Sequence, residues 1–267
     1  MSQRTMEAHY KPNWQLTQAH GLTGYNCGYA ARPGSESFEG HQQALVWRLL
    51  GDTPIDRDAV ILDVGCGIGG PTGWIFERAN CRLVIGLEYL GFSVRAAEAR
   101  WRNASARPRF IQGDAQRLPV GDDSVDLIFN LESALHYADK DAFIAECGRI
   151  LKPGGLLCLG DITTHRKTLF LPVELLNRLP SQFNSNVHLW SGTDYILALR
   201  QHGFEVLRHE EASQEVADSL ADGLDEIKQR GWRAARGFRG RAAFLAGLRF
   251  LLRRRLLTYD LFRARRK

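Results

Sequence analysis

The sequence has few of the residues that mark a cross-linked, metal-built or membrane-spanning protein. Its 267 residues include only five cysteines, an odd number with no C-x-x-C pair, so neither a disulfide framework nor a zinc site is expected. No window reaches the roughly 18 uninterrupted apolar residues of a membrane span, and no apolar targeting core follows residues 1–5. These absences predict a soluble protein of the reducing cytoplasm, without a metal centre.

Acidic residues are scarce in the last 40 positions. Residues 228–267 hold 14 lysines and arginines against one acid, Asp260, which gives this segment a charge of +13 and leaves the first 227 residues at −8. Such a segment suits an acidic carrier protein, a phosphorylated substrate, a membrane surface or nucleic acid. The alternative is a solvated helix face that needs no partner. Charge alone leaves both interpretations open.

What the sequence does contain is a buried strand that runs into a glycine-rich turn. Residues 60–64 form a nearly continuous apolar run, and Gly65, Gly67 and Gly70 follow it in G-x-G-x-x-G spacing. Glycines let the backbone take positive φ and approach a ligand closely. The next apolar run ends in Glu88, roughly 20 residues past the glycines, where a carboxylate can accept bonds from both ribose hydroxyls. Both features predict an adenosine-bearing cofactor, NAD or another.

Strand-like and helix-like segments alternate along the rest of the chain, which predicts a doubly wound α/β fold with right-handed crossovers. The expected strands are residues 60–64, 83–88, 108–112, 125–130, 155–161, 204–210 and 256–264. We expect one domain, residues 1–267, with an N-terminal lid over residues 1–36. Two connections are long enough to be functional caps. Residues 165–191 are expected to roof the substrate, and residues 213–252 to form a basic helical insertion before the last strand.

Further motifs follow the glycine turn in order: Gly113–Ala115 after the third strand, Asn130 and Leu131 at the end of the fourth, and Leu151–Gly155 before the fifth. Taken together they resemble the class I methyltransferases that use S-adenosylmethionine (SAM), from about Tyr25 to Phe204. Within that class they are similar to the small-molecule type, such as gamma-tocopherol methyltransferase and the sugar O-methyltransferase of rebeccamycin biosynthesis. The resemblance implies a Rossmann-like, mostly parallel sheet of seven strands whose last strand is antiparallel.

The resemblance also implies which residues bind SAM. They are Tyr29, Asp63, Gly65, Gly67, Glu88, Asp114, Ala115, Asn130 and Leu131. Gly65 and Gly67 would line the methionine end, Glu88 would hold the ribose and Asp114 would accept from the adenine amine. Asp63 would either order the turn or meet the methionine amino group. Tyr29 would close a lid on the cofactor or pack as an ordinary aromatic, and these two roles are left open.

The segment after the fourth strand carries the expected catalytic group. Glu132, Ser133 and His136 are similar to the E-S-x-x-H arrangement of the tocopherol and sugar O-methyltransferase relatives, and the N-P-P-Y turn of amino-methylating relatives is absent. A histidine suits removal of a hydroxyl proton at neutral pH. Asp161, at the end of the fifth strand, is expected to hold the His136 imidazole in its tautomer. The alternative is that both residues are structural.

These features predict a SAM-dependent methyltransferase that acts on a small organic acceptor, a hydroxyl oxygen of a specialised metabolite in natural-product biosynthesis. Methylation of carbon in an aromatic or prenylated acceptor is the alternative, because the same E-S-x-x-H region serves ring-methylating relatives. Methylation of nucleic acid has only the basic charge in its favour, since no RNA-binding module is evident. A binding protein that keeps the cofactor pocket without catalysis is a further alternative.

Overall fold

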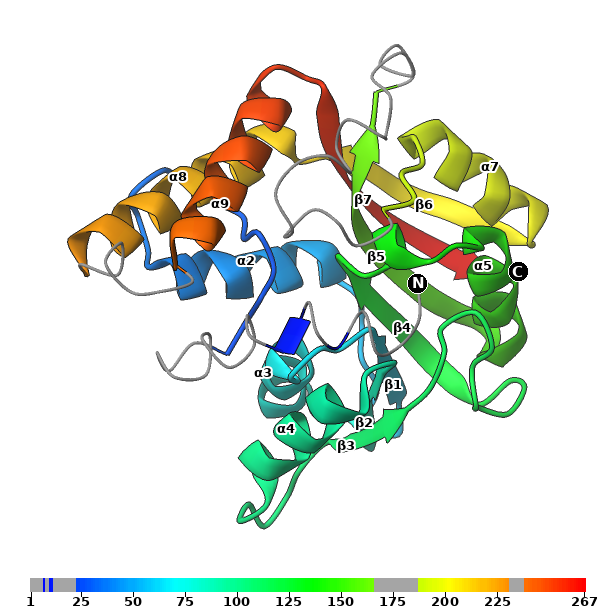
Figure 1. Ribbon diagram of the computed structural model, residues 1–267. Helices are drawn as coiled ribbons and strands as arrows, with labels where there is room; N and C mark the ends of the chain where they lie inside the picture. The colour runs from blue at the N-terminus through cyan, green and yellow to red at the C-terminus, as the bar shows by residue number, and fades with distance from the viewer. Residues whose placement is uncertain (1–6, 8–9, 12–22, 166–186, 231–237) are drawn as a thin grey trace.

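A seven-stranded sheet forms the centre of the protein in the computed structural model, which describes residues 7, 10–11, 23–165, 187–230 and 238–267. The strand order is β3-β2-β1-β4-β5-β7-β6 (Figure 1). The strands are β1 (Val60–Val64), β2 (Leu83–Glu88), β3 (Arg109–Gln112), β4 (Val125–Leu131), β5 (Leu151–Thr164), β6 (Phe204–Glu211) and β7 (Leu257–Arg266). The first five run parallel, while β7 is antiparallel to both β5 and β6. The predicted doubly wound sheet with an antiparallel last strand is confirmed.

Helices cover both faces of the sheet because successive strand residues point to opposite sides. Ile61 of β1 belongs to a core shared with α2, α8 and α9, whereas Leu62 belongs to a core shared with α5 and α7. The helices are α2 (Phe38–Leu50), α3 (Gly70–Arg78), α4 (Gly91–Trp101), α5 (Lys140–Ile150), α7 (Gly192–Gln201), α8 (Ser213–Gln229) and α9 (Phe238–Arg253), with a 3₁₀ turn η1 (Ala134–His136). Ser37 caps α2, and Ser191 forms a capping box on α7.

The structure describes the two long connections only in part. Within residues 213–252, the described residues include α8 and most of α9. The proposed substrate cap lies almost wholly outside the described residues, because only its ends are placed, and the same holds for most of the N-terminal lid. The division into one domain with a lid and a cap stays a prediction. The strand that begins at Leu151 is longer than predicted, because Val125 of β4 already pairs with that residue.

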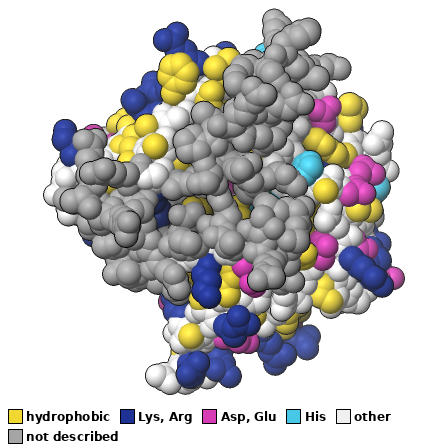
Figure 2. All heavy atoms as spheres, viewed as in Figure 1, with side chains coloured by type: hydrophobic (Ala, Val, Ile, Leu, Met, Phe, Trp, Pro, Cys, Tyr) yellow, Lys and Arg dark blue, Asp and Glu magenta, His cyan; other side chains and the backbone are white. Residues whose placement is uncertain are grey.

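The basic C-terminal segment is folded into the domain. Leu245, Leu248 and Leu252 of α9 are buried in the core, so the apolar stripe of this helix packs on its own protein. Arg253 pairs with Asp218, and Arg255 lies 3.7 Å from Glu211. Part of the positive charge of the C-terminal segment is therefore paired with acidic residues that precede it in the sequence. Basic and apolar side chains still alternate on the surface at the upper left of Figure 2, over the region of α9 in Figure 1. No helix in the described ranges is long and apolar enough to cross a membrane.

Candidate functional site

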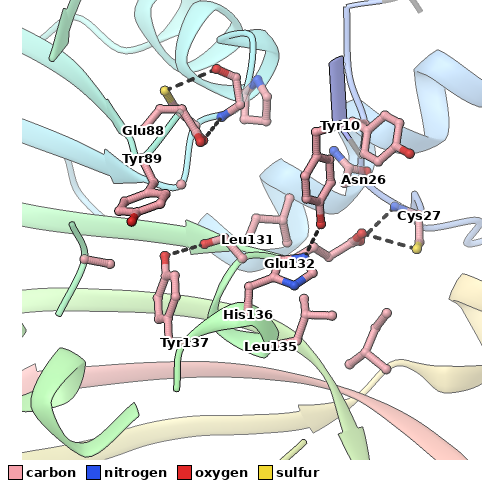
Figure 3. Close-up of a pocket in the computed structure, with 18 of the residues that line it drawn as sticks. Tyr10, Asn26, Cys27, Glu88, Tyr89, Leu131, Glu132, Leu135, His136 and Tyr137 are labelled. Carbon is pink, nitrogen blue, oxygen red and sulfur yellow. Dashed lines mark hydrogen bonds between the residues drawn. The ribbon is translucent and has the colours of Figure 1, made fainter. Parts of the chain in front are cut away.

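A cavity of about 500 Å³ opens beyond the carboxyl ends of the parallel strands, where an open α/β sheet binds its ligands. Its walls come from the glycine turn after β1, the ends of β2 and β4, the turn after β3, η1 and one side of α9. Figure 3 shows side chains from the end of β2, the end of β4 and η1 converging on one space, with Tyr10 and Cys27 of the N-terminal part of the chain beside them. The cavity therefore joins the predicted cofactor residues to the predicted catalytic histidine.

The glycine turn is held open by its backbone conformation and by Glu88. Gly65, Gly67 and Gly69 have φ angles of 78°, 57° and 77°, a region that side chains other than glycine rarely adopt. The Gly67 amide donates to Glu88 Oε2 at 2.9 Å, and the Leu90 amide donates to Glu88 Oε1 at 3.0 Å. Burial raises the pKa of Glu88. Each carboxylate oxygen has a further lone pair, so Glu88 can brace the turn and still accept from ribose hydroxyls.

Two of the predicted cofactor residues support the turn from behind. Asp63 is 2% exposed and accepts a hydrogen bond from Thr72 Oγ1 at 2.5 Å, and burial raises its pKa to about 7. Asn130 is fully buried and donates to the Val64 carbonyl at 2.9 Å and to Ser133 Oγ at 2.7 Å. Neither side chain is among those lining the cavity. The structure therefore places both side chains behind the turn, where they hydrogen-bond to the protein, and their expected contacts with the cofactor stay predictions.

Tyr29 does not face the cavity. The Arg48 guanidinium lies over its ring at 5.5 Å, and the ring packs against the α2 side of the core. The chain turns away at Gly28, whose φ is 75° and where a Cβ would collide with Ser219. Tyr25–Cys27 of the same segment line the cavity instead. Of the two roles left open for Tyr29, the structure places it as a packed aromatic.

The other predicted cofactor residues do line the cavity: Gly65, Gly67, Glu88, Asp114, Ala115 and Leu131. Asp114 Oδ1 accepts from the Gln116 amide at 2.9 Å, which shapes the turn after β3. This set fits SAM, because it combines a glycine backbone that lines the cavity, a carboxylate at the end of β2 and apolar side chains such as Leu87 and Leu90. Within the described ranges, no three His, Cys, Asp or Glu side chains gather as a metal site.

His136 lines the same cavity from η1, just past β4. Its Nε2 lies 2.6 Å from the hydroxyl of Tyr10, and the two rings meet edge to face with centroids 5.7 Å apart. Figure 3 shows the phenol and the imidazole pointing toward one another across the cavity. The histidine thus presents a ring nitrogen to a hydroxyl group at hydrogen-bonding distance. Tyr10 comes from the N-terminal segment, and no motif in the sequence predicted it as a site residue.

Asp161 does not orient His136 directly. Its Oδ2 accepts from the Tyr195 hydroxyl at 2.6 Å and lies 3.5 Å from Lys140 Nζ, and among the described residues its Oδ1 has no hydrogen-bond partner. The carboxyl is fully buried and does not line the cavity. The expected hydrogen bond between Asp161 and His136 is therefore wrong. The prediction fails because β5 places Asp161 beneath η1, where its carboxylate faces the buried Lys140.

Glu132 faces the cavity and was not predicted as a site residue on its own. It has a φ of 52°, unusual for a residue with a side chain, and it accepts from the Cys27 amide and the Tyr259 hydroxyl, each at 2.7 Å. Burial raises its pKa to about 7. Arg241 of α9 also lines the cavity, 8% exposed, with its guanidinium 5.1 Å from the Tyr25 ring centroid. The E-S-x-x-H motif was the one signal for Glu132, while Arg241 and Tyr259 are brought in only by the fold.

Comparison with known proteins agrees with this geometry. Residues 62–159 match a family described as a methyltransferase domain. The erythromycin 3''-O-methyltransferase of Saccharopolyspora erythraea is 34% identical over 139 residues, 51% of this chain and 45% of that protein. The 27-O-demethylrifamycin SV methyltransferase of Amycolatopsis mediterranei is 32% identical over 67% of this chain and 66% of its own length. The sterol 24-C-methyltransferase ERG6 of Saccharomyces cerevisiae is 28% identical over 74% of this chain and 50% of its own.

The chain spans about half the length of two of these relatives: the match covers 45% of the erythromycin methyltransferase and 50% of the yeast sterol methyltransferase. Among solved structures, the geranyl diphosphate C-methyltransferase of Streptomyces coelicolor A3(2), in complex with geranyl diphosphate and S-adenosyl-L-homocysteine (SAH), superposes with a TM-score of 0.76. It is 17% identical and covers 95% of this chain and 93% of that one. At this identity the likeness shows the fold.

Proposed function

Because this chain belongs to the class I SAM-dependent methyltransferases, we propose that it transfers a methyl group from SAM to a hydroxyl oxygen of a small organic acceptor. The proposed general base is His136. SAM supplies the methyl group on a positively charged sulfonium, so the leaving group needs no further activation. The protein must then hold the acceptor in line and take its proton.

The observation that carries the proposal is the contact of a hydroxyl with His136. A phenol hydroxyl already lies 2.6 Å from Nε2, inside the cavity that holds the glycine turn and Glu88. A neutral imidazole that accepts this hydrogen bond can accept the same bond from an alcohol or phenol of the acceptor, and it can remove that proton as the oxygen attacks. In this proposal Tyr10 marks the acceptor position and leaves it when the acceptor binds.

The walls of the acceptor side support a small and largely apolar molecule. Leu135, Ile162, Phe244, Leu245 and Leu248 are among the residues that line the cavity, and in this proposal they face the acceptor. Apolar walls with a few polar groups are typical of small-molecule sites, because burial of the ligand drives binding while the polar groups orient it. The names of the relatives that act on erythromycin, rifamycin and sterol describe acceptors of this kind. We propose a specialised metabolite as the acceptor on these grounds.

Methylation of carbon is a second candidate, favoured by Glu132. Addition of a methyl cation to a double bond leaves positive charge on the acceptor, and a buried carboxylate can stabilise it. Glu132 lies in the cavity with a pKa near neutrality, at about 7, so it is partly ionised at working pH. The yeast sterol relative is named for methylation at carbon.

Mass spectrometry with deuterated-methyl SAM tests both candidates. The protein is incubated with a panel of hydroxylated polyketides, phenols and prenylated compounds, and products that gain the labelled methyl are located by NMR. A methyl on oxygen supports the proposal, and a methyl on carbon supports the second candidate. A related methyltransferase with its own acceptor serves as the positive control. If this control is labelled and the protein binds SAM but labels no compound of the panel, the proposed activity is wrong.

A further inference from the structure

A buried lysine lies beneath the turn that carries His136. Lys140, the first residue of α5, is 1% exposed, and its ammonium donates to the carbonyl oxygen of Ala134, the first residue of η1. The same nitrogen lies 3.5 Å from Asp161 Oδ2 and 5.5 Å from the centre of the Tyr195 ring. Burying a lysine this completely is costly unless each of its neighbours compensates it. The arrangement therefore needs a reason beyond core packing.

The partners of Lys140 form a chain that ends at η1. Tyr195 of α7 donates to Asp161 Oδ2 at 2.6 Å, Asp161 faces Lys140, and Lys140 holds Ala134. Burial lowers the pKa of Lys140 and raises that of Asp161, and each partner opposes the other's shift. None of the three side chains lines the cavity. They therefore do not touch a molecule in the cavity themselves, but they hold the backbone of η1, which does line it.

Lys140 shares the support of this backbone with other hydrogen bonds, among them one from the His188 amide to the Leu135 carbonyl at 2.7 Å. Within η1 the His136 amide donates to the Ser133 carbonyl at 3.0 Å, and the Tyr137 amide donates to the Ala134 carbonyl at 3.0 Å. A single 3₁₀ turn has poorer hydrogen-bond geometry than an α-helix and is easily distorted. A charged donor strengthens the bond to the Ala134 carbonyl, because charge-assisted hydrogen bonds are roughly twice as strong as neutral ones. Lys140 thus fixes the residue two positions before His136.

We propose that Lys140 and Asp161 are positioning residues for the reaction. The lysine, anchored on the Asp161 carboxylate, clamps the Ala134 carbonyl and so sets where the His136 imidazole stands in the cavity. This inference rests on the proposed role of His136. It gives Asp161 an indirect part in catalysis, through Lys140 and the backbone, in place of the direct contact that the sequence predicted. A shift of about 1 Å at a reacting group can cost on the order of a hundredfold in rate.

The test replaces the whole buried polar group by apolar side chains of similar size, Lys140→Met, Asp161→Leu and Tyr195→Phe together. Replacement of an entire buried ion pair is often neutral for stability, whereas removal of one partner leaves an uncompensated charge. We therefore expect the triple variant to melt within a few degrees of wild type. The matched control is Lys152→Met, which breaks a half-buried 2.8 Å ion pair with Asp126 away from η1.

Hydrogen exchange followed by mass spectrometry gives a readout that does not need activity. In the triple variant the amides of residues 134–137 should exchange about tenfold to a hundredfold faster than in wild type, because a hydrogen bond from a charged group is lost. The turnover number should fall at least tenfold, while SAH affinity stays within twofold. The Lys152→Met protein should match wild type in all three measurements.

Wild-type exchange of residues 134–137 in the folded triple variant would overturn the clamp. Faster exchange with unchanged turnover would overturn its role in positioning. A failure of the proposed function gives a different result. His136→Ala would then have a wild-type turnover number, while residues 134–137 of the triple variant would still exchange faster than in wild type. Should the triple variant not fold, Asp161→Asn keeps the size of the side chain and weakens the anchor. It should then show the same two changes to a smaller degree, and wild-type exchange and turnover in that variant would overturn the proposal.

Discussion

The buried carboxyl of Glu132 makes the stability of the protein depend on pH. Its ordinary pKa is 4.5, and burial raises the pKa in the folded protein to about 7. Between these values the folded state holds the proton more tightly than the unfolded state does, so the protonated carboxyl favours folding. This contribution is fully present below pH 4.5 and is lost as the pH rises through 7. A difference of about 2.5 pKa units corresponds to about 3 kcal/mol.

Glu132→Gln isolates this contribution, because glutamine resembles the protonated acid and can still accept from the Cys27 amide and the Tyr259 hydroxyl. Urea unfolding of both proteins at pH 5 and pH 8 gives the free energy of unfolding. We expect the variant to gain about 2 to 3 kcal/mol relative to wild type between the two pH values. The exposed Glu205→Gln should show no such difference. If the free energy of unfolding changes equally in wild type and variant between pH 5 and pH 8, the Glu132 carboxyl does not have the raised pKa that its burial implies.

The cofactor side and the lid yield three further predictions. Gly67→Ala should leave the protein folded and weaken SAM binding at least tenfold. A side chain at a φ of 57° costs about 1 to 2 kcal/mol, and it would stand where we propose that the cofactor meets the backbone. Undiminished affinity in calorimetry would remove the turn from the proposed site. Glu88→Ala should weaken the binding of SAM and of SAH equally, by about 1 to 3 kcal/mol. If only SAM binding is weakened, Glu88 does not bind the ribose, which both molecules share. Tyr10→Phe should lower the KM for a hydroxyl acceptor, by about tenfold at most, since the acceptor no longer displaces the phenol. A fall in turnover number instead would place Tyr10 in the proton path.

The sequence predicted the sheet because its signals are local. Residues 60–64 and 83–88 are apolar runs with glycine or acid at their ends, and the structure places strands at both. The glycines and Glu88 were also predictable, since their spacing follows from how a strand, a turn and a helix succeed one another. His136 could be predicted from the residues around it, and it does line the cavity.

The errors concern side chains whose direction depends on distant segments. Gly28 turns Tyr29 out of the cavity, and the sequence around Tyr29 shows no sign of the clash with Ser219 that requires this glycine. Asp161 ends the predicted strand, but Lys140 intercepts it from a different element. Arg241 reaches the cavity only because α9 packs against α8 and β7. Such contacts arise from tertiary packing, which no local pattern in one sequence encodes.

The turnover number of His136→Ala tests the central claim most directly. His188 provides the matched control, because it is a second histidine that lines the same cavity. With SAM and an identified hydroxyl acceptor at saturation, His136→Ala should turn over about 10² to 10⁴ times more slowly than wild type, with SAH affinity nearly unchanged. His188→Ala should stay much closer to wild type. A His136→Ala protein with a near wild-type rate would contradict the account, because the acceptor would then lose its proton without this imidazole.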